Sequence, residues 1–166
     1  MKLVNFLMGL VLFSFLASMT VQAQEESKFV GGNSLGILVP QNDLGDVYDI
    51  GLGFYGSLDY NATENLALRL DVGVHSFSGE DENSDSNGNG TDNNPEKTVY
   101  ELTAGVRGKL SVFYLEGRAG YFFGFDEFGY VPSAGLRFGK FDLQGSYAII
   151  GGNDFAGFRI GYYWAK

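Results

Sequence analysis

The sequence predicts an all-β protein in which eight antiparallel strands run up and down and close into a barrel. After Gln24, segments of about ten residues alternate apolar with small or polar side chains. Between these segments no apolar stripe recurs every 3.6 residues, so no helix is expected after residue 23. The 25 glycines, 15 phenylalanines and 10 tyrosines, with only 3 prolines, suit short strands joined by tight turns.

Residues 1–23 are expected to be a secretory signal peptide, which leaves residues 24–166 as one barrel domain. Lys2 supplies the positive charge, residues 3–17 form the apolar stretch, and Val21 and Ala23 are the small residues before the cut. The apolar stretch is shorter than the ~20 residues of a membrane-spanning helix. The chain has no Cys, which excludes a lipid-anchored cysteine, disulfides and thiolate metal sites.

The connections between the expected strands alternate in length. The strands are expected at residues 28–39, 47–59, 65–77, 98–109, 112–123, 129–139, 141–150 and 156–165. Connections two, four and six are short, whereas the others include the longer acidic stretches. In an up-and-down barrel every second connection lies at the same end. Short turns at one end and longer loops at the other are typical of a bacterial outer-membrane barrel with periplasmic termini and extracellular long loops.

The placement of charge predicts which face of the strands points inward. Every arginine lies inside an expected strand between apolar or glycine neighbours, and every lysine after the signal peptide lies at a terminus or a connection. A soluble barrel would carry lysine and glutamate along its outer polar face. An arginine on the lipid side would cost about 2–4 kcal/mol near the midplane. The sequence therefore predicts a transmembrane barrel with a packed polar interior, and a soluble lipocalin-like barrel with the apolar face inside is the alternative.

The predicted interior network follows from the alternation along each strand. Its members are Arg69, Asp71, Glu101, Arg107, Glu116, Arg118, Arg137 and Arg159, with Tyr55 and Tyr114 also expected inside. Aromatic residues fall on the opposite, apolar faces, several near strand ends where interfacial girdles occur. They are Tyr48, Phe54, Tyr60, Tyr100, Phe113, Tyr121, Phe141, Tyr147, Phe158 and Trp164.

This pattern resembles the small OmpA/OmpX-like outer-membrane β-barrels, and in particular the Bacteroidetes-type barrel domain. The resemblance covers the chain after the signal peptide and rests on eight alternating strands, a polar interior and glycine-rich hairpins. The last strand, "FAGFRIGYYWAK", also resembles the signal that the barrel assembly machinery recognises, although it ends in Ala165 and Lys166 instead of an aromatic residue. The resemblance implies a structural, adhesive or assembly role and no cofactor.

Residues 85–96, "DSNGNGTDNNPE", match the spacing of an EF-hand calcium loop. Asp85, Asn87, Asn89 and Glu96 occupy ligand positions of that pattern. However, the flanking segments are expected strands, whereas an EF-hand needs helices on both sides. The favoured interpretation is a solvated extracellular loop. Weak binding of a divalent cation such as calcium is the alternative, because acidic residues are dense here.

His75, the only histidine, is followed by Ser76 and Ser78, so a hydrolase or acyltransferase has to be considered. Ser76 points to the opposite face of the strand, and Ser78 is expected just beyond its end, so neither is placed as a nucleophile beside the base. His75 is therefore expected to cap the interior polar network, and no catalytic residue is assigned.

The predicted function is a non-enzymatic outer-membrane barrel with a structural or surface-interaction role through its acidic extracellular loops. A narrow porin-like channel remains an alternative, although eight strands enclose just enough space for side chains. The net charge of −9 argues against nucleic acid. The expected partners are outer-membrane lipid and lipopolysaccharide, the barrel assembly machinery during insertion, and a surface or envelope protein.

Overall fold

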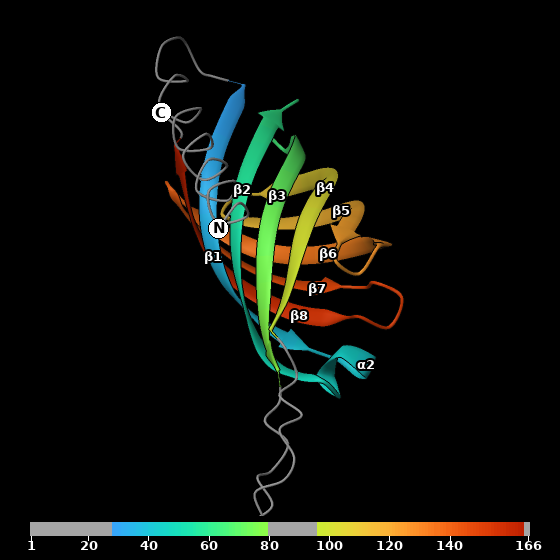
Figure 1. Cartoon of the computed structure of the whole chain (residues 1–166). Coiled ribbons are helices and arrows are strands. Elements are labelled where there is room, and N and C mark those ends of the chain that lie inside the picture. Colours follow the sequence, from blue (N-terminus) through green and yellow to red (C-terminus); the bar gives the residue numbers. More distant parts are fainter. Residues whose placement is uncertain (1–27, 80–95, 165–166) are drawn as a thin grey trace, which may run out of the picture.

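The computed structural model describes residues 28–79 and 96–164, which form one closed barrel of eight strands (Figure 1). Each strand pairs antiparallel with the next, and β8 closes the barrel against β1. The strands are β1 (Phe29–Pro40), β2 (Tyr48–Asn61), β3 (Leu66–Gly79), β4 (Lys97–Leu110), β5 (Phe113–Phe123), β6 (Glu127–Phe138), β7 (Phe141–Ala148) and β8 (Phe155–Trp164). The predicted fold class is confirmed.

The two ends of the barrel differ in their connections. At the turn end, the strands are joined through residues 62–65, 111–112 and 139–140, and the described chain begins and ends there. At the loop end, the connections are residues 41–47, 80–96, 124–126 and 149–154. Ser111 and Gly139 have positive φ angles of 59° each, as the first residues of two-residue hairpin turns.

The outer surface is apolar along the strands. Leucine, valine and isoleucine side chains such as Leu35, Leu52 and Leu115, each 66% exposed, lie on the outside of the barrel. Each such side chain gains about 1.5–3 kcal/mol on leaving water. An outer face of this kind requires lipid around it, so the barrel is a transmembrane barrel and the lipocalin-like alternative, which needs the apolar face inside, is wrong.

Aromatic side chains gather on the outside at both ends of the barrel. At the turn end, Phe141 and Tyr162 pack with ring centroids 5.6 Å apart. At the loop end, Phe128 and Tyr130 do the same, also at 5.6 Å. Two such girdles are typical of barrels whose ends lie at the two membrane interfaces. Tyr48 does not belong to them: a register shift between Tyr48 and Gly51 turns it toward the interior, against buried apolar residues.

One short helix, α2 (Asn42–Gly45), lies in the connection between β1 and β2, so the expectation of no helix was wrong. A single turn is too short to show an apolar period. It forms because Leu44, only 2% exposed, packs into the open loop end of the barrel. Asn42 Nδ2 donates to Asp154 Oδ2 at 2.8 Å, which ties this connection to the one between β7 and β8.

The pairing of β6 with β7 has a gap. Tyr130 and Ile149 exchange two backbone hydrogen bonds, and Ser133 pairs with Ser146. The pairs between them are missing. Backbone groups of successive residues point alternately to the two neighbouring strands, and the backbone nitrogen of Pro132 points to β7 but has no N–H to donate. The ladder between β6 and β7 is therefore locally weak at Pro132.

Several predictions fall on residues 1–27, 80–95 and 165–166, outside the described residues. They are the signal peptide at 1–23 and the loop residues Asp85, Asn87 and Asn89. In the described ranges, no helix is long and apolar enough to cross a membrane.

Candidate functional site

Charged residues of the described chain gather in the interior of the barrel. It consists of a charged network in the turn-side and middle part, an apolar layer at the loop end, and a cavity at the turn end. The charged network contains five arginines and five carboxylates: Arg69, Arg107, Arg118, Arg137, Arg159, Asp59, Asp71, Glu101, Glu116 and Asp142. The charges are equal in number, so this network carries no net charge.

Asp59 on β2 accepts contacts from three arginines on three strands. Arg69 Nη1 lies 3.2 Å from Asp59 Oδ1, and Arg107 Nη1 and Arg137 Nη1 lie 3.3 Å and 3.0 Å from Oδ2. Asp59 is fully buried. A buried carboxylate is tolerated only with such partners, because removing a charge from water costs several kcal/mol.

Asp71 on β3 is a second centre of the network. It pairs with Arg69 at 2.9 Å, with Arg159 at 3.2 Å, and with Arg118. These contacts join β3 to β5 and β8, and thus tie strands that do not neighbour one another in the sheet.

Glu116 on β5 is the third centre. Its Oε2 lies 2.7 Å from Arg107 Nη2, and its Oε1 lies 2.9 Å from Arg118 Nε. Gln144 Nε2 donates to Glu116 Oε1 at 3.0 Å, and Arg159 Nε donates to Gln144 Oε1. An amide that both donates and accepts thus links two charged groups within the network.

Aromatic rings fill the space beside the guanidinium groups. Arg107 Cζ lies 3.9 Å from the Tyr114 ring centroid, and Arg137 Cζ lies 3.8 Å from that of Tyr163. These rings fit because Gly135 and Gly32 lack a Cβ where the Tyr114 and Tyr163 rings approach.

His75 lies between the charged network and the apolar layer, as expected for a residue that caps the network. Its Nε2 is 3.1 Å from Glu101 Oε2, and its ring packs edge-on against Phe155 at 5.3 Å. Ser76 and Ser78 are exposed on the outside, whereas His75 is fully buried inside. No serine of this segment can therefore act as a nucleophile beside His75.

The loop end of the interior is filled by an apolar layer that the sequence analysis did not identify. Its members are Leu38, Leu44, Phe77, Val99, Phe122, Val131, Ala148, Ile150 and Phe155. They come from strands and loop-end connections and are 3% exposed or less. The layer closes the end of the lumen above the charged network.

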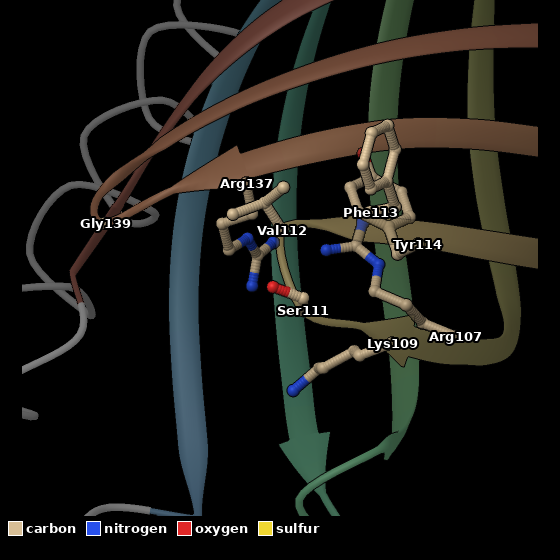
Figure 2. A pocket seen from close by; sticks show the side chains of 8 residues that line it. All are labelled: Arg107, Lys109, Ser111, Val112, Phe113, Tyr114, Arg137 and Gly139. Atoms are coloured by element: carbon tan, nitrogen blue, oxygen red, sulfur yellow. The ribbon is translucent and has the colours of Figure 1, made fainter.

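A cavity of about 240 Å³ opens at the turn end, between the β4–β5 and β6–β7 hairpins (Figure 2). Its lining residues are Arg107, Lys109, Ser111, Val112, Phe113, Tyr114, Arg137 and Gly139. In Figure 2 the side chains of Arg137 and Ser111 both line the cavity, and Lys109 extends toward β2. Lys109 Nζ donates there to Asn61 Oδ1.

All eight residues of the predicted interior network lie inside the barrel. Seven of them are joined by ion pairs with one another, and Arg137, at the turn-side edge, joins the network through Asp59 and Asp142. The sequence analysis missed Asp59, Asp142 and Gln144. The alternation that places Tyr55 and Ser57 inside also places Asp59 inside, so this signal was present. Asp142 and Gln144 share a face of β7 for the same reason.

Most of the predicted metal site lies outside the described residues. Of its four residues only Glu96 is described, and it is exposed just before β4. Within the described residues no group of three or more His, Asp or Glu is arranged to hold a metal ion.

Comparisons with known proteins extend the fold result. No protein-family profile matches the chain, and no curated protein matches it. The structure of Neisserial surface protein A is similar with a TM-score of 0.53 and 15% identity, over 86% of this chain and all of that one. Ail, the attachment invasion locus protein of Yersinia pestis, gives 0.47 and 17% over 81% and 98%. A de novo designed transmembrane β-barrel gives 0.48 and 15% over 85% and 98%. At 15% identity the likeness to Neisserial surface protein A shows the fold and not the activity.

Proposed function

We propose that this chain is a non-enzymatic outer-membrane β-barrel protein that acts through its loop-end surface, as a structural or surface-interaction protein. One observation carries the proposal: the interior is occupied by a charged network without net charge, and an apolar layer closes it at the loop end. The chemistry available to a partner is then on the ends of the barrel. The Bacteroidetes-type assignment belongs to this proposal and rests on the sequence resemblance.

The closed interior disfavours the narrow channel. A hydrated ion crossing the lumen would have to displace buried ion pairs such as Arg107 with Glu116 and then pass the apolar layer around Phe77 and Phe155. Both steps are costly, because buried charges left without partners are strongly destabilising. The arginines and carboxylates are therefore assigned a structural role.

The loop end offers an acidic surface. Asp43, Asp46, Asp49 and Asp126 are all exposed there. Near the same end begin residues 80–95, whose sequence is also acidic. Such a surface suits a cationic partner, which includes a basic protein surface and the divalent cations that bridge lipopolysaccharide. We place this end outside the cell and the termini in the periplasm.

The complete burial of His75 supports a non-enzymatic protein. His75 is sealed between Glu101, Tyr55 and Phe155, away from both mouths of the barrel. A general base needs access to a substrate proton, and this position provides none.

An epitope inserted in residues 80–95 tests the proposal. The tagged chain is expected to fold, because loop tips tolerate insertion, and an antibody is expected to reach the tag on intact cells. A matched insertion at Thr63, in the turn between β2 and β3, should be reached only after the outer membrane is permeabilised. Antibody access to Thr63 but not to residues 80–95 on intact cells would contradict the proposed orientation.

A further inference from the structure

The turn-end cavity carries an excess of positive charge. The five arginines of the interior are matched by five carboxylates, so Lys109 is an additional cation. Lys109 Nζ has a neutral partner, Asn61 Oδ1, and forms no ion pair with any residue the structure describes. An anion entering the cavity would therefore find a cation that is not already held in an ion pair with a carboxylate of the described chain.

Arg137, which lines this cavity, has one side-chain donor without a partner. Its Nη1 and Nε are used by Asp59 and Asp142, both at 3.0 Å, whereas its buried Nη2 has no hydrogen bond or ion pair in the described structure. Three other buried side-chain atoms also have neither a hydrogen bond nor an ion pair. They belong to Ser34, His75 and Arg159, and none of these residues lines the cavity. A buried guanidinium N–H without an acceptor is costly, and an anion would relieve that cost.

Ser111 adds a hydroxyl at the same place. It is the first residue of the β4–β5 turn and lines the cavity beside Arg137 (Figure 2). A lysine ammonium, a guanidinium edge and a hydroxyl are together the donor set that phosphate oxygens accept from. A volume of about 240 Å³ is ample for a phosphate group.

The outer surface next to the cavity indicates where such a phosphate would come from. Phe113, which lines the cavity, is 62% exposed, and Leu110, beside Lys109, is 71% exposed. Phe138 and Phe141 flank the other hairpin and are also exposed. These apolar side chains belong to the turn-end girdle, which lies at the level of lipid headgroups. A lipid could thus place its phosphate in the cavity and its acyl chains along Leu110 and Phe113.

We infer that the turn-end cavity binds the phosphate of a phospholipid headgroup, held by Lys109, the free Nη2 edge of Arg137 and the Ser111 hydroxyl. The inference rests on the proposed membrane placement and adds a specific lipid site to it. The site lies on the opposite end of the barrel from the acidic surface.

The test is a titration of the ¹⁵N-labelled protein, refolded in zwitterionic detergent micelles, with dihexanoyl-phosphatidylglycerol. The amide signals of Lys109, Ser111 and Arg137 should shift and saturate. Lys109→Gln should raise Kd about fivefold, as expected for the loss of one partly exposed charge contact. Lys140→Gln is the matched control: it removes the same charge from the neighbouring, exposed turn and should leave Kd unchanged.

Inorganic phosphate is the second probe and should bind more weakly, because it gains no contact with the apolar girdle. Shifts that never saturate, or equal losses in both lysine variants, would overturn the site in favour of diffuse surface attraction. Equal affinity for inorganic phosphate would overturn the assignment to a lipid. If the protein refolds in micelles but does not bind, only this inference fails. If it forms no β-rich state in detergent, the proposed function fails.

Discussion

Arg137 on β6 and Asp59 on β2 meet across the lumen, with Nη1 and Oδ2 3.0 Å apart and 78 positions between them in the sequence. In a closed barrel of eight strands these two strands stand on opposite walls. The ion pair thus holds the walls together through the interior, in addition to the hydrogen bonds of the sheet. Arg69 and Arg107 share the same carboxylate, so the loss of Asp59 would affect three strands at once.

Asp59→Asn should lower the free energy of unfolding by about 3–5 kcal/mol, because two buried arginines, Arg69 and Arg107, and the half-buried Arg137 lose a shared negative charge. The measurement is the urea midpoint of the barrel refolded in lipid vesicles. Glu64→Gln is the control, since Glu64 is exposed in the turn between β2 and β3 and its loss should change little. Equal midpoints for the two variants would show that the network adds no stability.

Phe77→Ala should destabilise the barrel by about 3–5 kcal/mol, since it opens a void in the apolar layer. The matched control is Phe128→Ala, which removes the same ring from the outside, where the side chain is 58% exposed. The comparison uses the same vesicle unfolding assay. If Phe128→Ala were the more damaging variant, the apolar layer would not be a packed core.

The wild-type protein should give no stepwise conductance in planar bilayers. The reason is that the charged network and the apolar layer lie in series along the lumen. Recordings with a known porin in the same bilayers provide the positive control. Reproducible steps that disappear on heat denaturation would revive the narrow channel as a function.

Pro132→Ala should repair the gap between β6 and β7 by supplying an N–H aimed at Tyr147. The new amide of residue 132 is then expected to exchange with solvent deuterium as slowly as that of Tyr130, which is hydrogen-bonded to Ile149. Hydrogen exchange followed by NMR measures both amides in one sample. Fast exchange at residue 132 beside slow exchange at Tyr130 would mean that the strands are spread there for a reason other than proline.

The alternation of side chains determined much of this structure from the sequence alone. It places Arg107 and Glu116 on one face and Val106 and Leu115 on the other, and the cost of arginine in lipid then decides which face is inside. Strand number, up-and-down order and the inward arginines follow from local pattern and one energetic argument. The strand ends shift by a few residues, as for β7, which stops at Ala148 instead of residue 150.

Alternation cannot say how deep inside the barrel a residue lies. Phe77, Val99 and Phe122 share the inward face with His75, Glu101 and Gly120, so the sequence assigns them to the interior but not to a separate apolar layer. That layer forms because the stagger between neighbouring strands places these residues, which come from different strands, at the same height along the barrel axis. Helix α2 is likewise held by the contact of Leu44 with this layer, which no local pattern records.

The sequence by itself thus determined the class of the protein, because face and charge are properties of each strand taken separately. Only the tertiary structure decided that Asp59 serves three arginines, that Lys109 forms no ion pair with an acid in the described ranges, and that a cavity opens at the turn end. These features depend on the register between strands and on the closure of β8 against β1. They are set by distances between residues far apart in the chain, and local periodicity contains no information about those distances.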